Sequence, residues 1–376
     1  MSPKKAYHKS DSVILIAVLL LIGVGLIAIF SASSILAEQR YGDHYYYLKK
    51  QGVFCLFGLL LMIVATHINY LFYRSFVYFF MGLSLLLLIL LFVPGFGVKV
   101  AGAQRWLRFG IISLQPSEAA KLCLAIFVAY SMSKNAENMG TFLHGLLPNV
   151  LMASIFMILI LLQPDLGTAL IIGMWVLILL FIGGVNLGQL MVLLGLLTPI
   201  VFYLISHTAY RLHRWWAFLN PWEDPQGFGF QIIHSFLAFG SGGLFGVGLG
   251  NSKQKLFYLP EPHTDFILSI IAEEIGFIGV SVILILFTFI IIKGMKIALH
   301  AQELFGTYLA LGITCMLAVQ VMVNMGVVMA LLPTKGLTLP FISYGGSSLV
   351  VNLIGIGILM NISKKTLNGP GELKRK

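Results

Sequence analysis

The chain has 376 residues, of which 59% are hydrophobic and only 10% are charged, and its mean hydropathy is +0.94. A soluble fold cannot bury that much apolar surface, so composition excludes an ordinary globular protein. The formal net charge is +10.

Apolar runs of about the length that crosses a hydrocarbon core of roughly 30 Å recur along the chain. The first run, at 13–33, follows three lysines and exceeds the apolar core of roughly 7–15 residues in a signal peptide, so we expect an uncleaved membrane anchor. The pattern predicts an all-α integral membrane protein, a polytopic bundle that forms a single domain over residues 1–376. About ten spanning helices are expected, near 13–33, 53–67, 76–93, 118–133, 146–162, 167–183, 189–206, 266–292, 306–332 and 343–363.

An even number of spans places both ends of the chain on one side of the membrane. If that side is the cytoplasm, it holds 12 of the 24 Lys and Arg residues, so the positive-inside rule hardly decides the orientation by itself. Acidic residues are fewer on this side, which makes it the more positive of the two. We therefore predict cytoplasmic tails at 1–12 and 364–376.

The basic residues of the predicted outer side lie in pairs, although the positive-inside rule disfavours them there. Two interpretations stay open for these pairs: recognition of an anionic ligand, and contact with lipid headgroups and water. The pairs are Arg105 with Arg108, Arg211 with Arg214, and Lys253 with Lys255.

The connection at 207–265, between the seventh and eighth spans, is far longer than the others, and long loops in compact domains are usually functional or disordered. Its many Trp and Phe side chains argue against disorder and favour an ordered segment at the membrane interface. Glycine recurs at Gly242, Gly246 and Gly250, a spacing that lets a short helix approach another backbone closely. We expect an outer lid or platform.

Asp265 follows this connection and opens the eighth span. A helix N-terminus favours the carboxylate, whereas partial desolvation raises its pKa, so a poised general base is one interpretation and a simple N-cap is the other. Glu273 lies about 12 Å further along the helix, too far for the paired carboxylates of a glycosidase, which need roughly 5–9.5 Å. Glu273 and Glu274 are therefore expected to be buried structural partners of a base or of backbone groups.

Other ionisable residues lie near the predicted membrane boundary. Glu118 and Lys121 are three residues apart on the fourth span and can pair within the helix, which favours a structural role over ligand contact. Asp165 stands in a short outer turn after Pro164, where capping of the next helix is the favoured role.

Helix breakers and hydroxyl residues gather before the tenth span, in Pro333-Thr334-Lys335-Gly336 and between Pro340 and Ser348. Non-helical backbone at membrane depth must be buried in protein or line a wet cavity. This region is therefore predicted to form a wall of the cavity that Asp265 faces.

Several common binding motifs are absent from the sequence. Neither GxGxxG nor GxxxxGK[ST] occurs in full, so a nucleotide cradle is unsupported. The three cysteines and nine histidines show no CxxC or HExxH spacing, so we expect no tightly bound metal or cofactor. A divalent cation carried by a phosphorylated substrate stays open.

Taken in order, these motifs resemble those of the SEDS (shape, elongation, division and sporulation) proteins, which are polytopic bacterial peptidoglycan polymerases. The residues around Lys335 and Glu261 are more similar to the cell-division branch, FtsW, than to the elongation branch, RodA, and SpoVE is a further close relative. The matching segments cover most of the chain: Gly102-Ala103-Gln104-Arg105-Trp106, Gln115-Pro116-Ser117-Glu118, Pro164-Asp165-Leu166-Gly167-Thr168, Asn220-Pro221-Trp222, Phe239-Gly240-Ser241-Gly242-Gly243-Leu244, Leu259-Pro260-Glu261-Pro262-His263-Thr264-Asp265-Phe266 and Ile342-Ser343-Tyr344-Gly345-Gly346-Ser347-Ser348.

The resemblance implies a glycosyltransferase that polymerises lipid II, an undecaprenyl pyrophosphate carrying a disaccharide pentapeptide, in septal cell-wall synthesis. Asp265 matches the family's essential outer aspartate and is expected to act as general base on the sugar 4-hydroxyl of the acceptor. Undecaprenyl pyrophosphate would leave with inversion at the anomeric carbon. A divalent cation, Mg²⁺ or Mn²⁺, could accompany the substrate pyrophosphate. We expect substrate contacts from Arg105, Arg214, Lys255, Glu118, Lys121, Asp165, His263, Lys335, Ser343 and Ser347, and no metal ligands.

The resemblance also implies partners and a location. The expected partners are the nascent glycan strand, membrane lipid, a class B penicillin-binding protein with transpeptidase activity, and divisome regulatory proteins, with no nucleic acid. The expected location is the bacterial inner membrane at the septum, with cytoplasmic termini and an extracytoplasmic active site. Two other functions stay open: a lipid II flippase, and a non-catalytic scaffold for the penicillin-binding protein.

Overall fold

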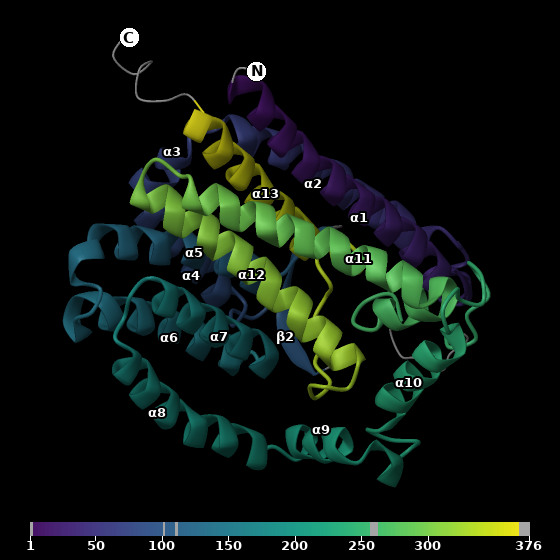
Figure 1. Cartoon of the computed structure of the whole chain (residues 1–376). Helices are drawn as coiled ribbons and strands as arrows, with labels where there is room; N and C mark the ends of the chain where they lie inside the picture. The colour runs from purple at the N-terminus through teal and green to yellow at the C-terminus, as the bar shows by residue number, and fades with distance from the viewer. Residues whose placement is uncertain (1–2, 101, 110–111, 256–261, 368–376) are drawn as a thin grey trace.

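The computed structural model describes residues 3–100, 102–109, 112–255 and 262–367. Long helices form a bundle, and one small sheet lies at its edge (Figure 1). Two parts of the sequence discussed above lie outside the described residues: Leu259-Pro260-Glu261, and the end of the predicted tail at 368–376.

A helix occupies each of the ten predicted spans, and together they confirm the prediction of a polytopic α-helical membrane protein. Helices are favoured in lipid because each satisfies its own backbone hydrogen bonds. Seven helical segments of the described chain are long and apolar enough to cross a membrane, while α4 and α7 are shorter apolar helices. The ten are α1 (Pro3–Tyr41), α2 (Tyr46–His67), α4 (Val77–Leu90), α5 (Pro116–Lys134), α6 (Leu147–Leu162), α7 (Leu166–Ile182), α8 (Leu187–Ser206), α11 (Ile267–Leu299), α12 (Leu304–Val328) and α13 (Gly346–Leu367).

Some boundaries differ from the expected ones. The helix α1 already begins at Pro3, so most of the predicted tail at 1–12 is helical. The helix α12 ends at Val328 rather than near 332, because Ala330 adopts a positive φ of 51°. The backbone N–H groups of Leu331 and Leu332 then both donate to the carbonyl of Gly326, at 2.7 and 3.0 Å, and close the helix end.

Short elements fill the connections. Two helices, α9 (Ala209–Leu219) and α10 (Phe230–Gly242), lie within the predicted long connection at 207–265 and are joined through the 3-10 turn η3 (Pro221–Glu223). The remaining short elements are α3 (Tyr70–Ser75), the 3-10 turn η1 (Ala136–Asn138) and the π-helical turn η2 (Phe142–Leu146).

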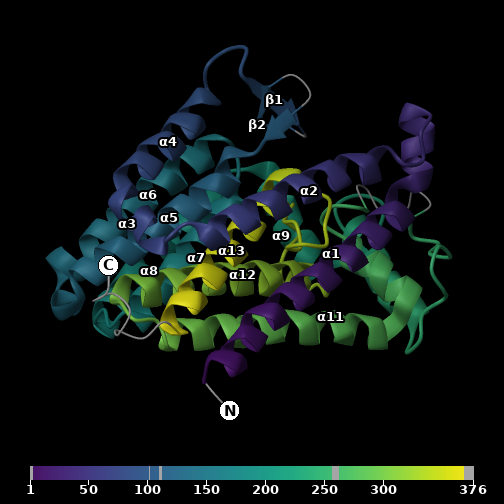
Figure 2. The ribbon, with the colours of Figure 1, turned by 90° about the horizontal axis from the view of Figure 1, so that it is seen from above.

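A three-stranded antiparallel sheet between α4 and α5 was not anticipated from the sequence. Its order is β1 (Gly97–Val100), β2 (Ala103–Phe109) and β3 (Ile112–Leu114), with Gly97 opposite Leu107 and Leu107 opposite Leu114. Figure 2 shows β1 and β2 projecting beyond the end of α4. The sheet gives Arg105 a fixed position at the edge of the bundle.

The centre of the bundle is formed by α12 and α13. In each, 89% of the most apolar stretch is buried, against 6% in α8. Figure 1 shows α8 and α9 standing apart from the central helices. The exposed apolar surface of α8 suits a helix that faces lipid.

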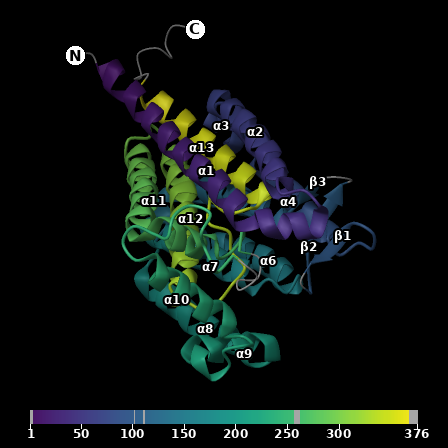
Figure 3. The ribbon, with the colours of Figure 1, turned by 90° about the vertical axis from the view of Figure 1, so that its right-hand side faces the viewer.

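The start of α1 and the end of α13 lie at the same end of the bundle, as an even number of spans requires (Figures 1 and 3). The short helices α9 and α10 lie toward the other end, together with the end of α12. We call this second end the α10 end.

The helix α11 is broken at Gly276, where φ is 66° and ψ is −170°. The freed carbonyls of Glu273 and Glu274 each accept a hydrogen bond at 3.0 Å from the backbone of the segment 243–248. Carbonyls of the same segment accept from the two residues after Gly276 at 2.9 and 3.2 Å. The segment that follows α10 is thus bonded into the break, so the interrupted helix keeps its polar groups satisfied.

Candidate functional site

Asp265 lies in a turn at 262–266 just before α11, and its side chain is half-buried. The N-cap of α11 is Phe266, so the simple N-cap interpretation does not describe the position of Asp265. The structure instead places the residue where non-helical segments from two parts of the chain meet.

Asn324, which is 1% exposed on α12, joins these two segments. Its Nδ2 donates to the carbonyl of Asp265 at 3.2 Å and to the carbonyl of Leu337 at 2.6 Å. One amide therefore sets the backbone of the aspartate relative to the chain that leads into α13.

Ser343 and the backbone of Tyr344 make a second connection between the same segments. The Ser343 hydroxyl donates to the carbonyl of Thr264 at 2.6 Å, and Tyr344 N–H donates to the carbonyl of His263 at 2.9 Å. The His263 ring is buried beside Tyr47, with ring centroids 4.3 Å apart. His263 and Ser343 thus flank Asp265 and fix the turn that carries it.

Gly336 provides the space that the Asp265 carboxylate occupies. A Cβ added at this glycine would lie 3.1 Å from Asp265 Oδ2, which is tighter than ordinary van der Waals contact. The carboxylate therefore rests directly against the backbone beside Lys335.

A cluster of opposite charges lies next to this position. Arg105 Nε lies 3.4 Å from Asp165 Oδ2, and its Nη2 donates to the carbonyl of Pro164 at 2.8 Å. Asp165 also caps α7 by accepting from the backbone and hydroxyl of Thr168, at 3.1 and 2.9 Å. The structure thus shows the cap expected for Asp165 and adds an arginine partner.

Lys335 belongs to the same cluster. A Cβ at Gly167 would meet the Lys335 side chain at 3.5 Å and the Asp165 carboxylate at 3.6 Å, so both side chains converge on this glycine. Burial lowers the pKa of Lys335 from its ordinary value of 10.5 to about 8, although the negative charge of Asp165 opposes this effect. An anion that entered the cluster would restore the charged form.

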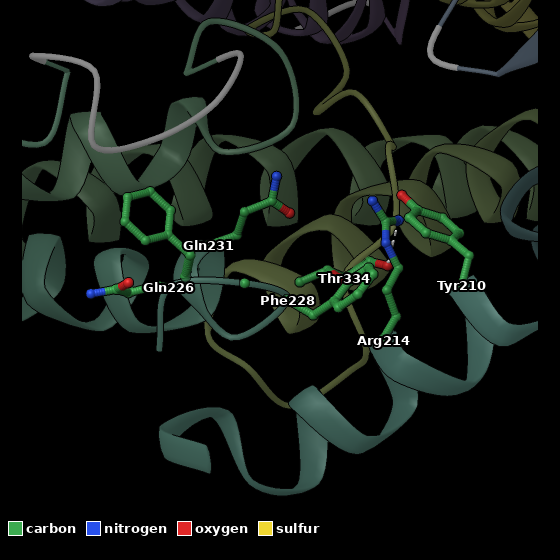
Figure 4. A pocket seen from close by; sticks show the side chains of 8 residues that line it. Tyr210, Arg214, Gln226, Phe228, Gln231 and Thr334 are labelled. Carbon is green, nitrogen blue, oxygen red and sulfur yellow. Dashed lines mark hydrogen bonds between the residues drawn. The ribbon is translucent and has the colours of Figure 1, made fainter. Parts of the chain in front are cut away.

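A cavity of about 230 Å³ adjoins the cluster, on the other side of Thr334. Arg214 stands in it, with Nη1 donating to the carbonyl of Thr334 at 3.1 Å and its guanidinium 4.5 Å from the centre of the Tyr210 ring. Figure 4 shows Tyr210, Arg214 and Gln231 presenting their polar ends on the same side of the cavity. The residues from Thr334 to Gly336 thus connect Arg214, Lys335 and Asp265.

Lys255 is held elsewhere, in a buried ion pair with Glu274. Its Nζ lies 3.0 Å from Glu274 Oε1 and also donates to Ser31 Oγ at 3.0 Å and to the carbonyl of Gly250 at 2.6 Å. The neighbouring carboxylate of Glu273 accepts hydrogen bonds from the hydroxyl of Ser252 and from backbone N–H groups of 253–254. Both glutamates therefore have the buried partners that the sequence analysis expected, while a substrate contact by Lys255 stays a prediction.

The pair formed by Glu118 and Lys121 is buried near the start of α5, with 2.8 Å between Oε1 and Nζ. The start of this helix is joined to α13, because the backbone N–H of Gln115 donates to Ser347 Oγ at 2.9 Å. Ser347 therefore connects the start of α5 to the first turn of α13. Contact of these three side chains with substrate stays a prediction.

The described residues contain no group of three His, Cys, Asp or Glu side chains arranged to hold a metal ion. The carboxylates near Asp265 are dispersed instead, and Asp165 is already bonded to Arg105 and Thr168. The described residues therefore offer no preformed set of carboxylate and histidine ligands for a resident divalent cation.

One residue that the geometry places at the site, Asn324, was not among the candidates from the sequence. Asn324 carried a usable signal, because an amide within a long apolar span is costly in lipid and usually bonds to neighbouring polar groups. Gly336 was predicted only as part of a cavity wall, since only the folded chain shows that the Asp265 carboxylate lies against it.

Known proteins of one family match this chain along almost its whole length. The family model for FtsW, RodA and SpoVE, described as cell cycle protein, matches residues 11–368. The chain is 46% identical over 366 residues to the probable peptidoglycan glycosyltransferase FtsW of Geobacter metallireducens, covering 97% of this chain and 98% of that one. It is 41% identical over 365 residues to stage V sporulation protein E of Bacillus subtilis, covering 97% and 99%.

Two solved structures are also similar. A chain from a study of how a peptidoglycan synthase complex coordinates polymerization and crosslinking superposes with a TM-score of 0.77 at 31% identity, covering 94% of this chain and 97% of that one. RodA of Thermus thermophilus superposes with a TM-score of 0.68 at 30% identity, covering 94% and 96%.

Proposed function

Because the chain belongs to the FtsW, RodA and SpoVE family of cell cycle proteins and is a peptidoglycan glycosyltransferase like its curated relatives, we propose that Asp265 is the general base of its reaction. Its substrate is lipid II, as both donor and acceptor. One observation carries the assignment: the half-buried carboxylate of Asp265 lies against Gly336, directly beside Lys335 and its charge cluster.

The proposed reaction is a displacement at the anomeric carbon of the donor sugar. Asp265 accepts the proton of the acceptor's 4-hydroxyl while that oxygen forms a bond to the anomeric carbon. The bond from this carbon to the pyrophosphate oxygen breaks, and its electron pair leaves with undecaprenyl pyrophosphate. Attack opposite the leaving group inverts the anomeric configuration, and the protonated aspartate returns its proton to water.

Arg105 and Lys335 are proposed to stabilise the negative charge that develops on the leaving pyrophosphate. Asp165 holds the Arg105 side chain and lies near Lys335, so little reorganisation is needed when the charge appears. A pyrophosphate beside Lys335 raises the pKa of its ammonium again, which keeps this cation charged during the reaction.

We further propose that the α10 end of the bundle is extracytoplasmic and the two termini are cytoplasmic, in the bacterial inner membrane at the division septum. The basic pairs at this end support the assignment, because lipid-linked pyrophosphate is an anion. A class B penicillin-binding protein is the proposed crosslinking partner, and divisome proteins the proposed regulators. The similarity to a chain from a peptidoglycan synthase complex supports such a pairing.

The decisive experiment is lipid II polymerisation by the purified protein and its cognate transpeptidase, whose own activity is blocked. We expect wild type to form glycan chains and Asp265→Ala and Asp265→Asn to form none, while both variants stay folded and in complex. The control is Asp43→Asn, because Asp43 is an aspartate of the α1–α2 turn that pairs with Lys49 at 2.8 Å.

Chains formed at the wild-type rate by Asp265→Ala would disprove the role of the base. If no variant and no wild-type preparation made chains, but labelled lipid II crossed liposomes equally with and without Asp265, the flippase would replace the polymerase.

A further inference from the structure

The cavity beside Thr334 has a lining that the reaction described above does not use. It is formed by α9, by the turn before α10, by the first residues of α10 and by Thr334, and eight residues contribute.

The walls of this cavity are preorganised. The Phe228 ring is stacked on His213, with centroids 5.3 Å apart, and meets Tyr210 edge-on at 5.6 Å. The turn that carries Phe228 is closed by Asp224, whose Oδ2 accepts from the Phe228 N–H at 2.9 Å. These contacts fix an aromatic surface before any ligand arrives.

The polar groups of the cavity are suited to a neutral ligand. Among the described residues that line the cavity, Arg214 carries the one charged side chain, and its guanidinium is already engaged by the carbonyl of Thr334 and the ring of Tyr210. The Gln231 amide makes no hydrogen bond within the described part of the chain, and Figure 4 shows it on the same side as Arg214 and the Tyr210 hydroxyl. An amide offers both donors and an acceptor, which suits hydroxyl and acetamido groups.

The position of the cavity relates it to the proposed base. Thr334 lies in its wall, and Gly336 lies against the Asp265 carboxylate. Two residues of extended chain span at most about 7 Å. The wall of the cavity and the backbone that contacts the proposed base are therefore close neighbours, as adjacent subsites for one substrate would require.

We propose that this cavity is a saccharide subsite that binds one N-acetylated sugar of the substrate through the Gln231 amide, Arg214 and the Phe228 ring. Apolar faces of a sugar ring pack on the aromatic surface, while its hydroxyl and acetamido groups bond to the amide and guanidinium. Pyrophosphate does not suit the cavity, because phosphate recognition favours several free cations. The subsite deepens the proposed function and rests on it.

The test separates sugar binding from catalysis by using the Asp265→Ala protein. Chitotetraose, a soluble oligomer of N-acetylglucosamine, is the probe, and saturation-transfer NMR measures its binding. Loss of one or two hydrogen bonds predicts affinity about tenfold weaker in Asp265→Ala/Gln231→Leu and in Asp265→Ala/Gln231→Asn. The matched control is Asp265→Ala/Gln189→Leu, because the Gln189 amide lies on α8 and bonds to Gly140.

Kinetics with Asp265 intact show whether the sugar belongs to donor or acceptor. In Gln231→Leu we expect KM to rise about tenfold and kcat to change little, because an interaction made in both ground and transition state is lost. A soluble glycan oligomer without pyrophosphate can act only as acceptor, so recovery by this oligomer assigns the subsite to the acceptor. A lipid-linked glycan whose terminal 4-hydroxyl is blocked can act only as donor, so recovery by this glycan assigns the subsite to the donor. If the Gln231 variants bind chitotetraose as tightly as their parent and keep its KM, the subsite is wrong. Polymerisation by Asp265→Ala would instead contradict the proposed function on which the subsite rests.

Discussion

Asn324 and Asn361 are both buried in the central helices, but they lie toward opposite ends of the bundle. Asn361, on α13, donates from Nδ2 to the carbonyl of Thr66 and accepts at Oδ1 from the N–H of Tyr70, each at 2.9 Å. Asn324 donates to two carbonyls through Nδ2, while its Oδ1 has no hydrogen-bond partner among the described residues. The first amide is satisfied at both polar atoms and the second is not.

The difference in hydrogen bonding suggests that Asn361 serves stability, whereas Asn324 serves the candidate site. Asn361 holds the turn between α2 and α3 against α13, and every hydrogen bond it makes lowers the free energy of the fold. Asn324 leaves a buried acceptor unpaired, which costs about 1–3 kcal/mol, and in return holds two non-helical segments around Asp265. Such local violations of polar satisfaction are expected at functional sites.

The largest effect is expected from Asn324→Leu. Loss of both Nδ2 hydrogen bonds frees the Asp265 turn from the segment at 335–338, and displacement of a base by about 1 Å can cost a hundredfold in rate. We expect kcat for lipid II polymerisation to fall by about that factor. The midpoint of thermal unfolding should fall less than in a variant that loses a fully paired amide, because removal of the unpaired Oδ1 offsets part of the cost of the two carbonyls that lose their donor.

Asn361→Leu is the matched control at the other end. It leaves the N–H of Tyr70 without this partner, so we expect stability to fall by about 1–3 kcal/mol and kcat to stay near the wild-type value. Equal losses of kcat in both variants, or equal losses of stability, would contradict the different roles of Asn324 and Asn361.

The next largest effect is expected on the KM for lipid II, which should depend on pH through Lys335 of the charge cluster. Lys335 has a pKa of about 8 in the fold against an ordinary value of 10.5, so it loses its charge as the pH rises through about 8. We expect KM for lipid II to rise through this range in wild type. In Lys335→Met we expect KM to be about tenfold higher at pH 7 and to lose this dependence.

Loss of the Lys335 proton should weaken substrate binding but stabilise the fold. Between pH 8 and 10.5 the unfolded chain keeps a proton on Lys335 that the folded chain has released, so the free energy of unfolding rises with pH in this window. Lys335→Met should lack this rise in thermal unfolding curves, and Lys49→Met, which removes an exposed lysine paired with Asp43, should keep it. A wild-type KM that is flat across pH 8 would contradict a charged role for Lys335.

The smallest effect is expected from Gly336→Ala. The added Cβ would lie 3.1 Å from Asp265 Oδ2, so the carboxylate must shift by a few tenths of an ångström. We expect kcat to fall less than tenfold with KM unchanged. Gly82→Ala on α4 is the control, because a Cβ there meets nothing within 4 Å, and a comparable loss in that variant would show that the site is not the cause.

The spanning helices and their order were predictable because apolar runs of about 20 residues have one stable form in lipid. The family and the position of Asp265 were predictable as well, since local motifs carry them. The sheet at 97–114 was not, because its strands are short and its register depends on pairing. The end of α12 was misplaced for a similar reason: the apolar run continues past Val328, and only the turn at Ala330 stops the helix.

The candidate substrate-binding cations show most clearly what the sequence could not predict. Arg105, Arg214, Lys255 and Lys335 were all candidates from charge and predicted side, but only folding brings Arg105 and Lys335 to Asp165 and commits Lys255 to Glu274. The sequence by itself determined the membrane class, the helices in their order and the family, because hydropathy and motifs are local properties. Tertiary structure alone decided which cations share a cluster, which amide holds the aspartate and where a cavity opens, because contacts between distant segments depend on how the helices pack.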